Sequence, residues 1–244
     1  MASTSETGHA KNVTNFQNLI AFVTGFGTAY SPSKISLKLP QLIAIKAEAD
    51  TKLADVLAKN TAYNNKVNER QTAFNGLKSL STRLVNALQI TDASDQIIKD
   101  AKAFNRKMQG QRASVTVTNP ADQNTPAPNI ISSSHQSYSQ QIQHLSGLIS
   151  VLESEPSYAP NETDLQLATL VVKLNELTSK NNAVATSYTN ISNSRIARNK
   201  TLYSTEGSIF DVASEVKKYI KSIYGASSPE FALVKGIEFK KPKS

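Results

Sequence analysis

The sequence predicts an all-α protein, an elongated antiparallel helical bundle or coiled-coil-like rod built from a tandem duplication with two very long helices. Two observations lead to this fold class. Blocks of residues recur in the same order at offsets of 125 to 135 positions. Within each copy, apolar residues follow one another at steps of three or four over about 50 residues, a spacing typical of a helical seam rather than of a strand.

The duplication is carried by three collinear blocks. The matched segments are residues 30–32 and 158–160, 61–79 and 186–204, and 90–104 and 223–239. The middle block has the form TxYxNxxNxR in both copies, from Thr61 to Arg70 and from Thr186 to Arg195. A chain with such an internal repeat usually builds one pseudo-symmetric body.

Four segments follow from this repeat. Residues 1–15 are polar and are expected to form a flexible N-terminal segment, and residues 109–135 are rich in Pro, Ser, Thr and Asn, which is typical of a linker. Helical repeat 1 covers residues 16–108, and helical repeat 2, with a basic C-terminal tail, covers residues 136–244. The two repeats are expected to form one domain.

Each repeat is predicted to contain a short helix, a turn with proline, a very long helix and a short terminal segment. The apolar positions of the short helices lie within residues 16–26 and 142–152. Ser36 and Asp164 occupy matched positions before the long helices, where a side-chain oxygen can cap exposed amides. Gly76 and Gly207 lie inside the predicted long helices, so a kink or break is expected near them.

Repeat 2 also has recognisable stop and start signals. Gly225 is expected to end its long helix, because glycine readily adopts the left-handed conformation of a helix C-terminus. Ser228 and Pro229 then form the start of another short helix, and Gly236 follows it.

Polar residues interrupt the middle of both apolar seams and define what we call the polar waist. Its members are Asn60, Arg70, Asn181, Arg195 and Arg198. One interpretation is a polar groove that receives a partner. The other is that buried polar residues set the helix register by penalising wrong alignments.

Positive charge is concentrated at the ends of the two repeats. The whole chain has a formal net charge of +8. These cations could contact a polyanion such as nucleic acid or an anionic membrane surface, with nearby aromatic rings available for stacking. They could equally be solvated surface residues that favour helix C-termini. The residues are Lys99, Lys102, Arg106, Lys107, Lys217, Lys218, Lys221, Lys240, Lys241 and Lys243.

No residues form a recognisable catalytic, cofactor-binding or metal-binding group, so neither an enzymatic activity nor a cofactor is predicted. The chain has no Cys, and its three histidines, His9, His135 and His144, lack the spacing of a metal site. No secretory signal or membrane-spanning run is found, which favours a cytoplasmic location and leaves non-classical export open.

Three hypotheses of function remain. The leading one is a non-enzymatic structural or protein-interaction module, a stiff duplicated rod that acts in an assembly through a protein partner or self-association, without a small-molecule substrate. The second is polyanion binding through the basic ends. The third is a helical membrane-active component, for which residues 16–26 are the only apolar candidate segment.

Overall fold

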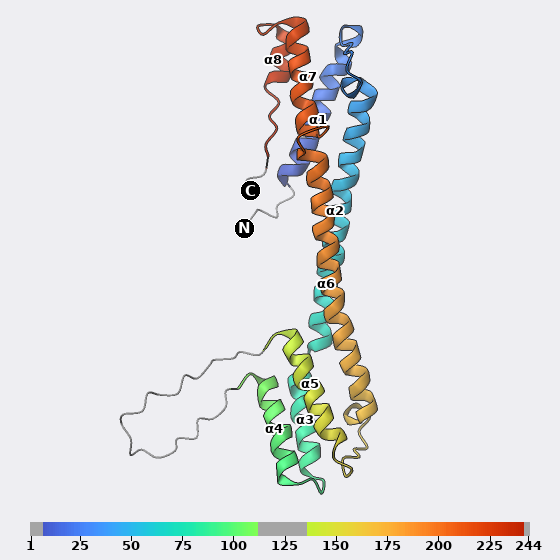
Figure 1. The fold of residues 1–244 in the computed structure, drawn as a ribbon, viewed down its shortest axis with the longest axis vertical. Helices are drawn as coiled ribbons and strands as arrows, with labels where there is room; N and C mark the ends of the chain where they lie inside the picture. Colours follow the sequence, from blue (N-terminus) through green and yellow to red (C-terminus); the bar gives the residue numbers. More distant parts are fainter. Residues whose placement is uncertain (1–6, 112–135, 242–244) are drawn as a thin grey trace, which may run out of the picture. The chain divides into compact units, whose positions relative to one another are not determined.

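The computed structural model describes residues 7–111 and 136–241, which are all-α, as predicted: these ranges contain α-helices and short 3-10 helices and no strand (Figure 1). Residues 112–135 of the predicted linker, which include His135, lie outside these ranges, and so does Lys243. The helices are α1 (Thr7–Gly25), α2 (Leu39–Phe74), α3 (Leu77–Gln89), α4 (Asp95–Gln109), α5 (Tyr138–Glu153), α6 (Leu167–Tyr203), α7 (Ile209–Tyr224) and α8 (Pro229–Lys235), with 3-10 helices η1 (Gly27–Ala29), η2 (Ile35–Leu37) and η3 (Thr163–Leu165).

The predicted long helices are each interrupted at a glycine. α2 has 36 residues and ends at Phe74, and α6 has 37 residues and ends at Tyr203. Gly76 and Gly207 follow with φ values of 79° and 68°, a left-handed conformation that residues with a Cβ rarely adopt. The expected break therefore occurs in both repeats, and the continuations α3 and α7 are separate helices.

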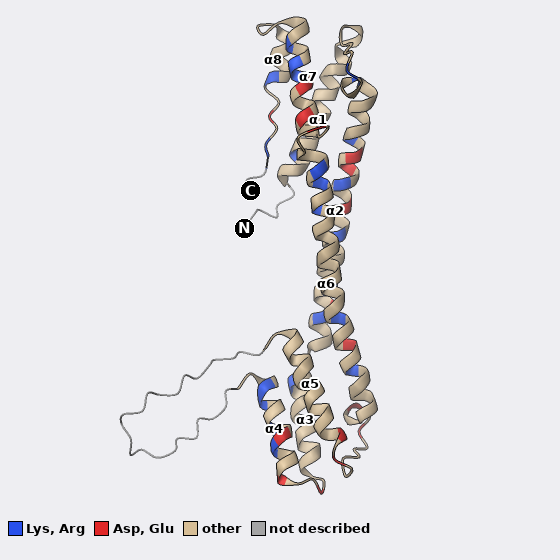
Figure 2. Cartoon of the chain, viewed as in Figure 1, with Lys and Arg blue, Asp and Glu red and all other residues tan. Residues whose placement is uncertain are grey.

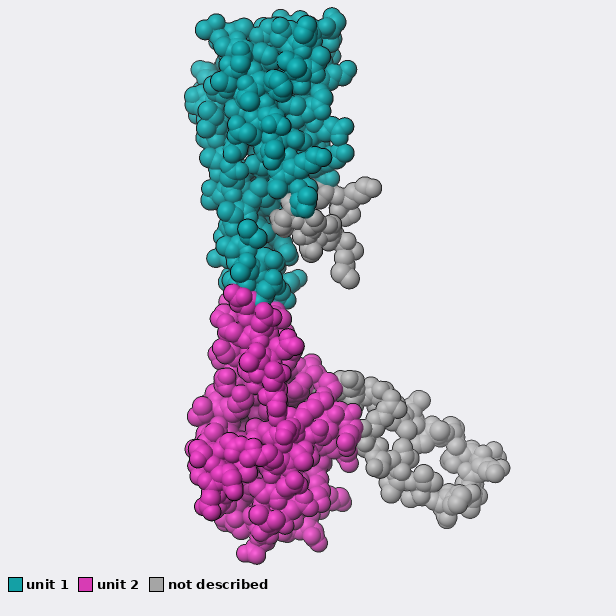
Figure 3. Space-filling model, turned by 180° about the vertical axis from the view of Figure 1, so that it is seen from behind, with its two compact units in different colours: residues 1–64, 187–244 teal, residues 65–186 magenta. Residues whose placement is uncertain are grey.

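The chain divides into two compact units, which do not coincide with the sequence repeats. Unit 1 contains residues 1–64 and 187–244, and unit 2 contains residues 65–186 (Figure 3). α2 and α6 contribute to both units. Each unit thus combines the first half of one predicted repeat with the second half of the other.

The core of unit 1 lies among α1, the first part of α2, the last part of α6, α7 and α8. α1 buries Phe16, Leu19 and Val23 on one side, and α7 buries Val216 and Ile220 against them. This apolar face of α1 lies within residues 16–26, the segment that the sequence indicated as a candidate for membrane activity. No described helix combines the length and the apolarity needed to cross a bilayer.

The core of unit 2 is built in the same way from α3, α4, α5 and the adjoining parts of α2 and α6. Leu145, Leu148 and Leu152 of α5 are fully buried against Leu84 and Leu88 of α3. The spacing of buried residues along α5 repeats that along α1, which buries residues 16, 19, 20 and 23.

The turn before each long helix is held by the same hydrogen bond. In unit 1 the Tyr30 hydroxyl donates to the carbonyl of Leu37 at 2.7 Å, and in unit 2 the Tyr158 hydroxyl donates to the carbonyl of Leu165 at 2.9 Å. Burial raises the pKa of Tyr30, and it raises the pKa of Tyr158 to about 12 with help from Glu162 and Asp164. Both rings therefore stay neutral donors at physiological pH.

Two local predictions were wrong. Ser36 and Asp164 do not cap the long helices: Ser36 lies within η2 with a buried Oγ that has no hydrogen-bond partner, and Asp164 lies within η3 and pairs with Arg83. The 3-10 turns occupy the positions where the pattern placed the first helical turn. In contrast, Gly225 ends α7, and Ser228 caps α8 through the amide of Phe231, as predicted.

Residues 7–15 are helical, although the sequence assigned them to a flexible segment. They form the first turns of α1, where His9, Asn12 and Val13 are buried. His9 and Asn12 bond to Tyr203, and Asn12 also bonds to Lys240, all more than 190 positions away. A local pattern of polar residues gives no sign of such a contact.

Candidate functional site

The five residues of the predicted polar waist do not form one site, because they fall in different units. Arg70 and Asn181 meet in unit 2, where the Arg70 Nη1 donates to Asn181 Oδ1 at 3.1 Å. The Arg70 guanidinium also lies 4.1 Å from the centre of the Tyr138 ring, which in turn packs edge-on against Phe74. Arg70 therefore fixes α2 against α5 and α6, a structural contact.

The remaining waist residues, Asn60, Arg195 and Arg198, belong to unit 1. Arg198 is 4% exposed and donates through Nε and Nη2 to the neighbouring Asn199 Oδ1 at 3.1 and 2.9 Å. Other polar contacts join α2 to α6 here: Ser194 Oγ donates to Asp55, and Thr201 Oγ1 donates to Glu48 at 2.9 Å. The sequence gives no sign of these pairs, because the two partners lie in different predicted repeats.

The predicted basic residues form two separate groups. Lys99, Lys102 and Lys107 are exposed on α4 of unit 2, with Arg106 half-buried beside them. Unit 1 carries the other group on α7 and in the C-terminal segment (Figure 2). Its described members are Lys217, Lys218, Lys221, Lys240 and Lys241.

Lys217 differs from the other cations because it serves the fold. Its Nζ donates to the carbonyl of Ile237 and lies 5.4 Å from the centre of the Phe239 ring. Burial lowers the pKa of Lys217, and Glu238 partly offsets this shift. A half-buried, bonded ammonium group has little freedom left to contact a polyanion.

Aromatic rings near these lysines pack against the cores. Phe104 lies against the core of unit 2, and Phe231 and Phe239 lie against the core of unit 1. Lysines cover their outer faces, with Lys107 Nζ 5.3 Å from the Phe104 ring centre and Lys221 Nζ 5.9 Å from that of Phe231. Rings held in this way are poorly placed to stack on bases, which require an open aromatic face.

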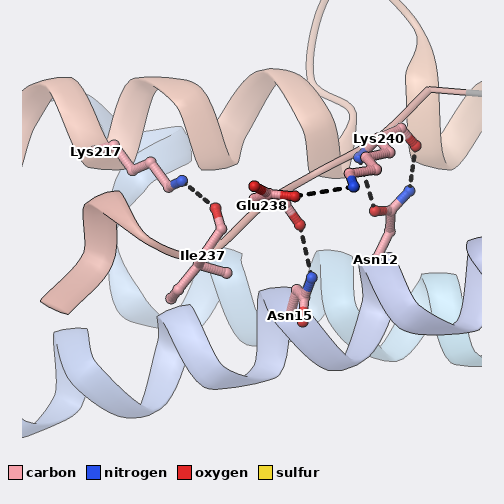
Figure 4. Close-up of polar contacts among 6 residues, drawn as sticks. All are labelled: Asn12, Asn15, Lys217, Ile237, Glu238 and Lys240. Carbon is pink, nitrogen blue, oxygen red and sulfur yellow. Dashed lines mark hydrogen bonds and ion pairs between the residues drawn. The ribbon is translucent and has the colours of Figure 1, made fainter.

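The most elaborate polar arrangement in unit 1 joins α1 to the C-terminal segment, residues 236–241, in what we call the C-terminal clasp (Figure 4). The Asn12 side chain bonds both backbone groups of Lys240: Nδ2 donates to its carbonyl at 2.8 Å, and Oδ1 accepts from its amide at 3.1 Å. Asn15 Nδ2 donates to the Glu238 carbonyl at 2.6 Å. Two asparagines one helical turn apart thus hold an extended segment along α1.

A buried cluster anchors the clasp from beneath. The Tyr203 hydroxyl lies 2.8 Å from His9 Nδ1 and accepts from Asn12 Nδ2 at 3.0 Å. Phe16 and Phe239 pack edge-on, with ring centres 6.5 Å apart. Residues of α1, the end of α6 and the C-terminal segment therefore meet in one place.

A cavity of about 660 Å³ lies beside the clasp, between α1 and the C-terminal segment. Its lining combines three lysines, Glu238 and several side-chain amides with the polar tip of Tyr203. The Glu238 carboxylate is 3.0 Å from Lys240 Nζ, and this pairing lowers the pKa of Glu238. The three lining lysines are Lys11, Lys240 and Lys241.

Opposite ion pairs occur at matched places in the two units. In unit 1, Lys34, in the turn before α2, contacts Glu215 of α7 at 2.6 Å. In unit 2, Asp164, in the turn before α6, accepts from Arg83 of α3, with Nη2 to Oδ1 at 3.2 Å. The pairing lowers the pKa of Asp164 and raises that of Arg83. The turn is basic in unit 1 and acidic in unit 2.

The described ranges contain no group of three His, Cys, Asp or Glu side chains placed to hold a metal ion. Comparison of the chain with protein-family models, with curated proteins and with solved structures finds no match.

Proposed function

We propose that this chain is a structural or protein-interaction module without enzymatic activity, an elongated helical bundle derived from a tandem duplication. The main support is the way the two units are composed. Each unit takes its helices from both predicted repeats, so the whole chain is used to build two related helical units. The hydrogen bonds of Tyr30 and Tyr158 and the matching buried positions of α1 and α5 support the duplication.

Matched exposed residues favour an interaction role. Ile90 and Ile223 occupy the same position of the repeat and are 88% and 43% exposed. Ile43 and Val171, at matched positions near the starts of α2 and α6, are 52% and 39% exposed. These matched positions are candidate contact points, because apolar surface that a partner removes from water stabilises the complex. Two related surfaces on one chain would allow it to join partners within an assembly.

The native mass of the protein tests this role. In a gentle extract of the cells that make it, the chain should migrate above its own mass of 26.4 kDa, and chemical cross-linking should retain it in that complex. A chain that runs at 26.4 kDa with and without cross-linker would overturn the proposal.

Small-angle scattering tests the elongated shape separately. A compact globule of this length has a radius of gyration of about 18 Å, so an elongated bundle should give a larger value.

Polyanion binding is the second candidate, and the cations around the cavity and on α4 favour it. Lys11, Lys240 and Lys241 line the cavity, whereas Lys99 and Lys102 are exposed on α4. Binding to DNA, RNA or anionic vesicles should weaken steeply as salt rises. The double variant K240E/K241E should abolish binding if the clasp region is the site, and K99E/K102E should do so if α4 is the site.

The membrane-active alternative would require α1 to leave the core of unit 1, where Phe16 and Leu19 are fully buried. Dye release from lipid vesicles would test it.

For the location of the protein, we propose the cytoplasm, which is the expectation from the sequence.

A further inference from the structure

The connections at one end of each unit occupy matched positions and carry opposite charges. In unit 1 these connections are residues 26–38 and 218–230, which we call the basic loop end. In unit 2 they are residues 154–166 and 85–97, which we call the acidic loop end. The turns at these ends share the same tyrosine-to-carbonyl hydrogen bond, so the two ends carry opposite charges on a similar local framework.

The basic loop end has a net charge of +3. Its charged residues are Lys34, Lys38, Lys218, Lys221 and Glu230. Packing brings its two segments together, because Phe26 contacts Tyr224 with ring centres 5.4 Å apart and Tyr30 contacts Tyr219 at 5.3 Å. Lys34, Lys38, Lys218 and Lys221 are all exposed.

The acidic loop end has a net charge of −5. Its charged residues are Asp92, Asp95, Glu155, Glu162 and Asp164. Figure 2 shows the acidic residues at the α3–α4 connection and along the α5–α6 connection. Asp92, Asp95, Glu162 and Asp164 are exposed, and Glu155 is half-buried and bonded to Ser157.

Each loop end also exposes isoleucine among its charges. Ile90 of the acidic end is 88% exposed, whereas Ile35 and Ile223 of the basic end are 68% and 43% exposed. Ile90 borders a hollow of about 410 Å³ lined by both acidic segments, with Asp92 and Glu162 at its edge. Apolar contact surrounded by complementary charge is the usual composition of a protein–protein interface.

From the charge complementarity of these matched surfaces, we infer that the chain binds a second copy of itself, with the basic loop end of one copy seated on the acidic loop end of the next. The inference rests on the proposed interaction role and names its partner. Because the two ends differ, the contact is heterologous, so successive copies form a ring or an open filament. Exposed ion pairs are screened by salt, so the association should weaken as ionic strength rises.

Two charge-reversal variants of the full chain test the inference. K38E/K218E changes the basic loop end from +3 to −1, and D92K/E162K changes the acidic loop end from −5 to −1. Lys34 and Asp164 are left unchanged so that their pairs with Glu215 and Arg83 stay intact. K59E/K200E is the matched control, because it reverses two exposed lysines of unit 1 outside the loop ends. Circular dichroism and thermal unfolding verify that every variant is folded.

Sedimentation velocity of the purified proteins at low and high salt gives the readout. The wild type and K59E/K200E should form species of several times 26.4 kDa at low salt, and each loop-end variant alone should sediment at 26.4 kDa. An equimolar mixture of the two loop-end variants should give a species of twice that mass and nothing larger, since only one intact basic end and one intact acidic end remain to pair.

A monomeric wild type at all concentrations and salts, or association that both loop-end variants retain, would overturn self-association. A wild type that is monomeric when purified but part of a larger complex in extracts would overturn this inference and leave the interaction role standing. If the purified wild type is monomeric and the larger complex in extracts is lost in K38E/K218E, the basic loop end binds an acidic partner of another kind, and the second copy is rejected.

Discussion

The two units build the same framework but close it with different elements. In unit 2, helix α4 packs directly against α5, and the Phe104 ring fits over Gly147, where an added Cβ would lie 2.3 Å from a ring carbon. In unit 1 the position that matches Gly147 is Asn18, which lines the 660 Å³ cavity, and the matching aromatic residue, Phe239, belongs to an extended segment.

The two closures differ in their chemistry. Glycine lets a second helix approach closely, because no side chain separates the two backbones. Unit 1 uses the side chains of Asn12 and Asn15 to hold an extended segment, whereas unit 2 uses apolar helix packing.

The largest expected loss of stability comes from Gly147→Ala, which disrupts the close packing of α4 on α5 in unit 2. The new methyl group must displace the Phe104 ring, and such overpacking should reduce the free energy of unfolding by about 1 to 3 kcal/mol. Chemical denaturation measures this change. Gly8→Ala in α1 is the control, because a Cβ there meets nothing within 4 Å and alanine favours the helix. Equal effects of the two substitutions would contradict the packing argument.

Asn12→Ala addresses the corresponding closure in unit 1. It removes both hydrogen bonds to the Lys240 backbone and the one to Tyr203, at an expected cost of about 1 to 2 kcal/mol. Hydrogen exchange should rise mainly in residues 236–241, since these would lose their attachment to α1. Asn15→Ala, which removes one exposed bond, should have a smaller effect. Unchanged exchange in Asn12→Ala would show that the clasp is held by other contacts.

The equivalence of the two turns is tested by Tyr30→Phe and Tyr158→Phe. Each substitution removes one buried hydrogen bond and should cost about 1 kcal/mol. Similar losses in thermal unfolding would support the matched role of the two tyrosines. A loss confined to one variant would mean that the units do not depend on this bond in the same way.

The smallest effect is an acid dependence that belongs to unit 2. Bonds from Lys180 and then Lys66 lower the pKa of Glu69 from 4.5 to about 2. A lowered folded-state pKa gives stability that is present above pH 4.5 and is lost as the pH falls towards 2. Because these groups are exposed, the effect should be slight and should shrink in high salt. In Glu69→Gln the free energy of unfolding should depend less on pH in that window. An unchanged pH dependence would reject the assignment.

Local sequence determined the helices and the positions where they start and end. Steps of three and four predicted the all-α class, and Gly76, Gly207, Gly225 and Ser228 gave the breaks and starts that the structure contains. These features depend on backbone conformation and on side chains within one helical turn. A pattern within the sequence is therefore sufficient to identify them.

Tertiary structure alone decided which halves of the repeats combine and where the polar groups meet. The two units cut across both repeats, and the polar waist falls into separate contacts such as Arg70 with Asn181. Asn12 and Lys240 are 228 positions apart, so the helical order of residues 7–15 could not be read from their polar composition. Long-range pairing depends on which surfaces become neighbours on folding, and the spacing of residues along one helix carries no information about that choice.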